Sequence, residues 1–262
     1  MSRLDSVFAA LRRERRTGLV TYVTAGDPDL DRSRAILVAL DRAGADVLEI
    51  GVPFSDPVAD GPVIQRAADR AVRNGTTLSN VLEMVTAVRA QVRTPIVLFS
   101  YANPILRLGL DRFAQRASDA GVDGVLVLDL PLEEAEPLRD TIVNAGLDPI
   151  FLVAPTTSPE RIRKAGALGR GFLYAISRLG VTGARATLDE GGRALVERIR
   201  AESDLPVAVG FGISHPDHVR EVGRWAEAAV VGSSLVGVIE HHGAAPDLVE
   251  AVEQHVRWLR DR

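Results

Sequence analysis

Eight short apolar runs, separated by longer segments with helical periodicity, constrain the fold of this chain more than any other feature. The runs occupy residues 19–24, 47–50, 95–99, 124–130, 149–153, 171–176, 206–212 and 228–233. They are continuous rather than alternating in hydrophobicity, which is expected for strands that are buried on both faces of a parallel sheet. The pattern therefore predicts eight parallel strands joined by helices.

The segments between these runs carry helix-end signals. Helices are predicted within residues 29–44, 76–92, 110–121, 132–146, 158–168, 190–203 and 217–226. Several of them end in Ala-Gly just before the next strand, and glycine is the preferred residue after a helix C-terminus. In "SPERI", Ser158 precedes a proline and an acid, which is typical of a helix N-terminus.

Strands and helices that alternate in this way predict a single (β/α)8 TIM barrel of the α/β class over residues 1–262. A doubly wound open sheet is the alternative, but no GxGxxG follows the first strand, where "TYVTAGDPD" stands instead. Two departures from a minimal barrel are expected: long loops after the second and sixth strands, and an extra N-terminal helix. The apolar stripe of that helix consists of Leu4, Val7, Phe8 and Leu11.

Charge and composition exclude several kinds of partner. The net charge of −4 leaves no broad basic field, so we expect no nucleic-acid partner. No run of about 18 apolar residues is present, so we expect no membrane span and a cytoplasmic location. Cysteine is absent, and Lys164 is the only lysine among the 31 Lys and Arg residues. A Schiff-base mechanism would therefore have to use Lys164.

One acid lies inside an apolar strand. In "VLEI", Glu49 stands between Leu48 and Ile50. If these two residues face the helices, Glu49 faces the interior of the barrel near the C-terminal ends of the strands, where active sites of this fold lie. Partial burial there would raise the pKa of Glu49 into the range of a general acid and base. The plainer alternative is a structural glutamate that an arginine or backbone amides satisfy.

Two more acids follow in a loop that contains three prolines. Asp56 and Asp60 belong to "VPFSDPVADGP", and Pro53, Pro57 and Pro62 restrict its conformation. The loop could therefore return a carboxylate over the mouth of the barrel at modest entropic cost. Either aspartate could instead be a simple turn residue.

Glycine-rich segments follow the last three strands. They are "SRLGVTGA" (177–184), "GFGIS" (210–214) and "VGSSL" (231–235). Glycines allow backbone amides to approach an anion closely, and a helix N-terminus after the eighth strand would add free N–H groups. Any one of these glycines alone would indicate a turn, whereas the three together favour a phosphate site.

Tyrosine and histidine give weaker signals. Tyr174 could face the barrel mouth, or it could be a core tyrosine with a hydrogen-bonded hydroxyl. His215 and His218 lie three residues apart near a helix start, which could seat a metal, but no suitable third ligand is close in sequence. We therefore expect no metal site.

Five motifs resemble those of a known family. "LEIGVPFSDPVADGPVIQ", "YANPI", "SRLGVTG", "GFGIS" and "VGSS" closely resemble the tryptophan synthase alpha subunit family. The similarity extends from the N-terminal helix to the last helix, in family order. It implies retro-aldol cleavage of indole-3-glycerol phosphate to indole and glyceraldehyde 3-phosphate. It also implies that Glu49 is the general acid and base, that Asp60 stabilises the indole nitrogen, and that Tyr174 assists in positioning.

The same resemblance implies the rest of the site. The phosphate would bind Gly183, Gly212, Gly232 and Ser233, and the indole pocket would consist of Tyr22, Ile64, Phe99, Leu126 and Leu152. Thr182 would belong to a loop that closes over the site and meets Asp60. Position 22 is tyrosine where members of the family often carry phenylalanine, which leaves the polarity of that wall open.

Partners and cofactors are implied in the same way. The family forms an α2β2 complex in which indole passes to a β subunit that carries pyridoxal phosphate, so no cofactor is expected in this chain. The implied β-subunit contacts are Asp56, Pro57, Asn103 and Pro104. The alternatives are a stand-alone lyase that releases indole, an idle subunit that only activates β, and, more distantly, an unrelated phosphosugar isomerase.

Overall fold

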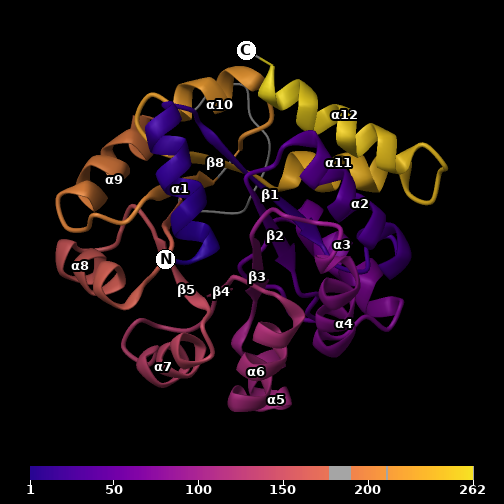
Figure 1. The fold of residues 1–262 in the computed structure, drawn as a ribbon, viewed down its shortest axis with the longest axis horizontal. Helices are drawn as coiled ribbons and strands as arrows, with labels where there is room; N and C mark the ends of the chain where they lie inside the picture. The colour runs from indigo at the N-terminus through magenta and orange to yellow at the C-terminus, as the bar shows by residue number, and fades with distance from the viewer. Residues whose placement is uncertain (177–189, 211, 262) are drawn as a thin grey trace.

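Eight parallel strands close into a barrel in which every strand pairs with its neighbours in sequence and β1 pairs with β8 (Figure 1). The computed structural model describes residues 1–176, 190–210 and 212–261. The strands are β1 (Gly18–Thr24), β2 (Val47–Gly51), β3 (Ile96–Ser100), β4 (Gly124–Val127), β5 (Asp148–Val153), β6 (Leu173–Ile176), β7 (Val207–Gly210) and β8 (Ala228–Val231). The predicted barrel is confirmed, and the open sheet is excluded by the β1–β8 pairing.

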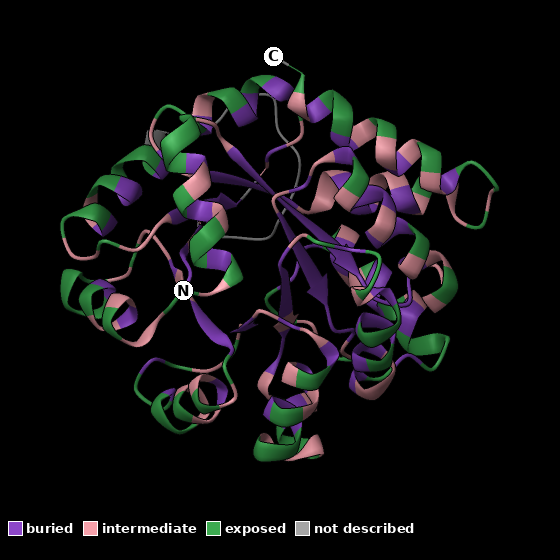
Figure 2. Ribbon diagram, in the orientation of Figure 1, coloured by how far each residue is buried: buried purple, intermediate pink, exposed green. Residues whose placement is uncertain are grey.

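Helices surround this barrel. Within the described residues they are α1 (Arg3–Glu14), α2 (Leu30–Ala43), α3 (Pro62–Arg73), α4 (Leu78–Arg89), α5 (Ala102–Leu108), α6 (Leu110–Ala120), α7 (Glu136–Asn144), α8 (Pro159–Leu168), α9 (Glu190–Arg200), α10 (Pro216–Val222), α11 (Ser233–His242) and α12 (Leu248–Arg260). The strands are buried and the outer helix faces are exposed (Figure 2). Helix ends follow the expected chemistry, since Gly44 and Gly121 close α2 and α6 in the left-handed region.

Helix α3 corrects the prediction of a long loop after the second strand. It begins one residue after Gly61, with Pro62 at its first position. Its buried face consists of Ile64 and three alanines, Ala67, Ala68 and Ala71. Alanine is a strong helix former, but it adds little to an apolar stripe, so hydrophobic periodicity alone did not reveal this helix.

The residues of each strand divide between two cores. Leu48 and Ile50 belong to the large core between the strands and the helices, whereas Val47 belongs to a smaller core inside the barrel. Because side chains alternate along a strand, this arrangement turns Glu49 toward the interior. The predicted orientation of β2 is therefore confirmed.

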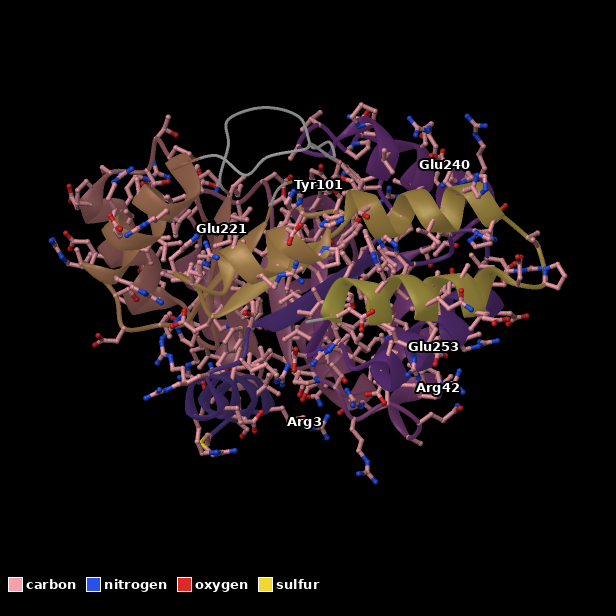
Figure 3. All side chains as sticks on the ribbon, turned by 90° about the horizontal axis from the view of Figure 1, so that it is seen from above. Arg3, Arg42, Tyr101, Glu221, Glu240 and Glu253 are labelled. Carbon is pink, nitrogen blue, oxygen red and sulfur yellow. The ribbon has the colours of Figure 1, made fainter. Side chains whose placement is uncertain are left out.

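Helix α1 closes the N-terminal end of the barrel. Ser2 and Asp5 form a capping box at its start, and Leu4, Phe8 and Leu11 are buried in the inner core. The ring of Phe8 lies 5.2 Å from that of Phe172. Figure 1 shows α1 lying across this end of the barrel. A view turned by 90° shows Arg3 of α1 on one side of the molecule and Tyr101, which follows β3, toward the opposite side (Figure 3).

Candidate active site

A cavity of about 940 Å³ lies at the C-terminal ends of the strands and opens to solvent. The described residues that line it are Tyr22, Glu49, Ala59, Asp60, Ile64, Phe99, Leu128, Leu152, Tyr174, Ile176, Gly212, Ile213, Val230, Gly232, Ser233 and Ser234. The cavity has mostly apolar walls, two carboxyl groups and a set of small residues that follow β7 and β8. This composition suits a flat apolar group that is joined to an anion.

Glu49 reaches the cavity from β2. Its side chain is 1% exposed, and among the described residues neither carboxyl oxygen has a hydrogen-bond partner. Burial, with a smaller contribution from the charge of Asp60, raises the pKa of Glu49 to about 8. The described residues therefore do not support the alternative of a glutamate that an arginine or backbone amides satisfy. A carboxyl group in this state can donate a proton at neutral pH and take one back.

Asp60 enters the cavity from the proline-containing loop just before α3. It is 7% exposed and accepts a hydrogen bond of 3.1 Å from the hydroxyl of Tyr101. Burial raises the pKa of Asp60 to about 6, while the hydrogen bond from Tyr101 opposes that rise. Gln65, in the first turn of α3, donates to the backbone oxygen of Asp60 at 2.8 Å and so helps to hold the loop. Asp60 is therefore mostly ionised at neutral pH, while Glu49 is mostly protonated.

Tyr101 is a site residue that the sequence had not revealed. It belongs to "YANP" (101–104), for which the resemblance implied only contact with a β subunit. Its hydroxyl accepts from the backbone N–H of Ala59 at 3.1 Å while it donates to Asp60. Its partners lie about forty residues earlier in the chain, so no local pattern could have identified the role.

Two tyrosines of the cavity wall, Tyr22 and Tyr174, each pack closely against a glycine. A Cβ atom on Gly51 would lie 2.1 Å from the hydroxyl of Tyr22, and one on Gly210 would lie 2.6 Å from the hydroxyl of Tyr174. Only glycine allows such close approach at these strand ends. The hydroxyl of Tyr22 lies 3.3 Å from the Oγ1 atom of Thr24, so this wall is polar at one point.

Four predicted wall residues line the cavity and one does not. Tyr22, Ile64, Phe99 and Leu152 are part of the lining, and the rings of Tyr22 and Phe99 meet edge to face at 5.2 Å. Leu126 is fully buried in the inner core, whereas Leu128 lines the cavity. Leu128 lies two positions further along the chain, just after β4. Ile176 and Ile213 are further wall residues that the sequence had not indicated.

Small residues after β7 and β8 also line the cavity. Gly212 has φ +71°, a left-handed conformation that favours glycine, and Gly232 is the N-cap of α11. Gly232, Ser233 and Ser234 therefore present the start of α11 to the cavity, where a helix has free N–H groups and a positive end. Thr182 and Gly183 lie outside the described residues.

The predicted subunit contacts lie on the loop after β2 and on α5. Asp56 and Asn103 are exposed, and Pro57 and Pro104 are half-buried. Ser55 donates to the carboxylate of Asp56 at 2.6 Å. Asp56 is therefore turned outward and does not join Glu49 and Asp60 in the cavity.

In the part of the chain that the structure describes, neither a metal-ligand cluster nor a lysine lies at the cavity. No group of three or more His, Asp or Glu side chains is arranged there to hold a metal. The Nδ1 atoms of His215 and His218 accept the backbone N–H groups of Asp217 and Ser214 at 3.2 and 3.3 Å. Lys164 lies on α8 beside Glu136 and is not part of the cavity lining. Among the described helices none is long and apolar enough to cross a bilayer.

The fold and the cavity together define a (β/α)8-barrel enzyme whose cavity holds two buried carboxyl groups. The family model "Tryptophan synthase alpha chain" matches residues 8–260. The chain belongs to the tryptophan synthase alpha chain family.

Individual relatives support this membership. The tryptophan synthase alpha chain of Geobacter sulfurreducens is 49% identical over 261 residues, which cover 100% of this chain and 98% of the relative. The crystal structure of the alpha subunit from Legionella pneumophila superposes with a TM-score of 0.91 at 38% identity, covering 99% of this chain and 97% of that one. A chain from a structure of the tryptophan synthase α2β2 complex of Pyrococcus furiosus superposes with a TM-score of 0.87 at 39% identity, covering 92% of this chain and 97% of that one.

Proposed function

We propose that this chain cleaves indole-3-glycerol phosphate to indole and glyceraldehyde 3-phosphate by a retro-aldol reaction. The observation that carries the proposal is the pair of buried carboxyl groups, Glu49 and Asp60, in a mostly apolar cavity that is also lined by the start of α11. An indole ring suits the apolar walls, and a phosphate suits the helix start.

Glu49 moves the proton in this reaction. Its protonated carboxyl group donates to C3 of the indole, which leaves a carboxylate and a cationic indolenine. The carboxylate then removes the proton from the hydroxyl on the carbon that is bonded to C3. As the C–C bond breaks, that carbon becomes the aldehyde, and the bonding electrons return to the ring and regenerate indole. The raised pKa of Glu49, about 8, supplies the protonated form that the first step requires.

Asp60 stabilises the intermediate. A carboxylate near the ring nitrogen attracts the positive charge that develops there once C3 is protonated. The indole ring itself accepts the electrons of the breaking bond, so neither a lysine Schiff base nor a metal ion is needed. Tyr101 supports this role because its hydrogen bond fixes the Asp60 carboxylate. We assign Tyr174 to positioning of the ring, since it lines the same cavity beside Glu49.

The phosphate is assigned to the small residues after β7 and β8. Backbone amides near Gly212, Gly232 and Ser233 would bind it, with the positive end of α11 adding to the attraction. The resemblance in sequence adds Gly183 to this set and gives Thr182 a part in a closing loop.

We further propose that a tryptophan synthase β subunit is the partner, in an α2β2 complex with pyridoxal phosphate on the β subunit and no cofactor on this chain. The loop after β2 and helix α5 carry two exposed apolar residues, Val58 (84% exposed) and Leu106 (65% exposed). They accompany Asp56, Pro57, Asn103 and Pro104 on the segments that bear Asp60 and Tyr101. A partner that covers these segments could therefore influence the carboxylate end of the cavity directly.

The test is indole release from indole-3-glycerol phosphate by the purified chain, with and without a cognate β subunit. We expect slow release that rises tenfold or more with β. Fast release that β leaves unchanged would indicate a stand-alone lyase instead. Absence of release under both conditions would contradict the proposal and leave the idle subunit, although such a subunit would not need two buried carboxyl groups, which are costly to keep.

A further inference from the structure

Two histidines contact the phosphate end of the cavity from behind. The Nε2 atom of His255, on α12, lies 2.9 Å from the hydroxyl oxygen of Ser234, the second residue of α11. The Nδ1 atom of His218, on α10, accepts the backbone N–H of Ser214 at 3.3 Å. Ser214 directly follows Ile213, which lines the cavity. Each histidine therefore holds one of the two segments to which we assign phosphate binding.

The contact of His218 defines its role as an acceptor. A backbone N–H can only donate, so the Nδ1 atom of His218 accepts in this contact. The side chain is largely buried, with 8% exposure, in the first turn of α10. It is thus a fixed acceptor that holds the segment between β7 and α10.

His255 makes the corresponding contact with α11. It is half-buried, and burial lowers its pKa, which favours the neutral ring. Its ring lies 5.5 Å from that of Trp258 on the same helix, and Trp258 in turn meets His215 at 5.1 Å. Helices α10 and α11 both pack on α12, and they lie together along one side of the barrel (Figure 1). This arrangement joins the two histidine contacts into one layer behind the cavity.

We propose that His255 and His218 are positioning residues that aim the two phosphate-binding segments at the substrate from outside the cavity. This inference rests on the proposed function, because that function assigns the phosphate to these segments. The hydroxyl of a serine near a helix start readily bonds to backbone groups of its own turn. Its bond to His255 instead keeps the amides of the first turn of α11 available to an anion. The bond from Ser214 likewise fixes the chain next to Gly212 and Ile213.

The test uses side-chain amides of two lengths. In His218→Asn the amide oxygen can take the place of Nδ1, and in His255→Gln the terminal amide can take the place of Nε2. The exchanged variants, His218→Gln and His255→Asn, carry the same amide group on a side chain of the wrong length. Affinity for glycerol 3-phosphate and for inorganic phosphate is measured by calorimetry, and kcat and KM are measured on indole-3-glycerol phosphate. The exposed His241, in the last turn of α11, supplies the control variant His241→Gln.

We expect the exchanged variants to raise Kd and KM about fivefold to tenfold, the effect of one lost hydrogen bond, while kcat stays within about twofold. His218→Asn, His255→Gln and His241→Gln should bind as the unaltered chain does. Ser234→Ala combined with His255→Asn should weaken binding no more than either change alone, because both remove the same bond.

Wild-type affinity in folded exchanged variants would overturn the inference. So would a loss of kcat together with thermal stability and no change in Kd, since that pattern indicates a purely structural role. If the unaltered chain itself binds neither phosphate compound, the phosphate assignment in the proposed function fails first. Normal binding by the unaltered chain that the histidine variants do not change would refute only this inference.

Discussion

One acid, Asp46, lies just before strand β2 and another, Glu49, lies within it, and the two acids have opposite environments. Asp46 immediately precedes the strand, and its carboxylate forms a two-point ion pair with Arg16 at 2.7 and 2.9 Å. It also accepts the backbone N–H of Leu19 at 2.8 Å. Glu49 lies three residues later, about 10 Å further along an extended strand, and none of the described residues that line its cavity is a cation.

The contrast separates stability from chemistry within one barrel. At the N-terminal end, α1 covers the core and Asp46 pairs with Arg16. At the C-terminal end, Glu49 stays protonated at neutral pH because burial disfavours its charged form. A carboxylate that is paired with arginine is poorly suited to proton transfer, whereas a buried carboxyl group without partners can give and take a proton. Asp46 and Glu49 therefore carry the same carboxyl group but differ in how it is partnered.

Removal of the carboxyl group of Glu49 should have the largest effect on activity. Glu49→Gln should lower kcat by about a thousandfold or more, because the amide cannot transfer a proton. Steady-state indole release measures this loss, and binding of glycerol 3-phosphate by the variant shows that its site is formed. Turnover at the original rate would contradict the mechanism.

The same variant should gain stability in alkaline solution. The pKa of Glu49 is raised in the folded chain, so its contribution to stability is complete below pH 4.5 and is lost as the pH rises to about 8. At pH 8 the free energy of unfolding of Glu49→Gln, measured by denaturant titration, should therefore exceed that of the original chain by about 2–4 kcal/mol. The difference should shrink toward pH 5. A difference that does not change with pH would indicate another cause.

Asp60→Ala should have the next largest effect. We expect kcat/KM to fall about a hundredfold or more, since the developing charge on the ring nitrogen loses its partner. Binding of glycerol 3-phosphate should persist, because the phosphate is assigned to the residues after β7 and β8. Loss of that binding would mean that Asp60 mainly supports the structure of its loop.

The two carboxyl groups should also shape the pH dependence of the reaction. Activity requires Asp60 ionised and Glu49 protonated, so kcat/KM should fall below pH about 6 and above pH about 8. A decrease of about tenfold per pH unit is expected beyond each limit. These values belong to the interacting pair, and a profile that stays flat to pH 9 would contradict the assigned protonation of Glu49.

Removal of the carboxyl group of Asp46 should have the smallest effect on activity. Asp46→Ala removes the two-point partner of Arg16 and the acceptor of the N–H of Leu19, which should cost about 2–3 kcal/mol of unfolding free energy. Denaturant titration measures this loss, while kcat and KM at low temperature should stay within about twofold. A large decrease in kcat would show that Asp46 contributes to catalysis as well as to stability.

The prediction from sequence succeeded where a strong local pattern decides the structure, and it failed where the local pattern is weak or where distant residues decide. Glu49 could be oriented because Leu48 and Ile50 beside it are apolar and strand side chains alternate. Helix α3 was missed because its buried face is mostly alanine. Leu126 was chosen in place of Leu128 because the pattern does not reveal how deep the cavity reaches into the barrel. The assignments of Thr182 and Gly183 remain predictions.

By itself, the sequence determined that the chain forms alternating strands and helices, that these close into one barrel, and that an acid points inward from the second strand. These features follow from hydrophobic periodicity and cap residues, which act over a few neighbouring positions. Only the tertiary structure decided that Asp60 meets Tyr101, that Glu49 is buried without a cation, and that His255 reaches Ser234. The physical reason is that desolvation and hydrogen bonding depend on groups brought together from distant parts of the chain, and no local pattern encodes which groups will meet.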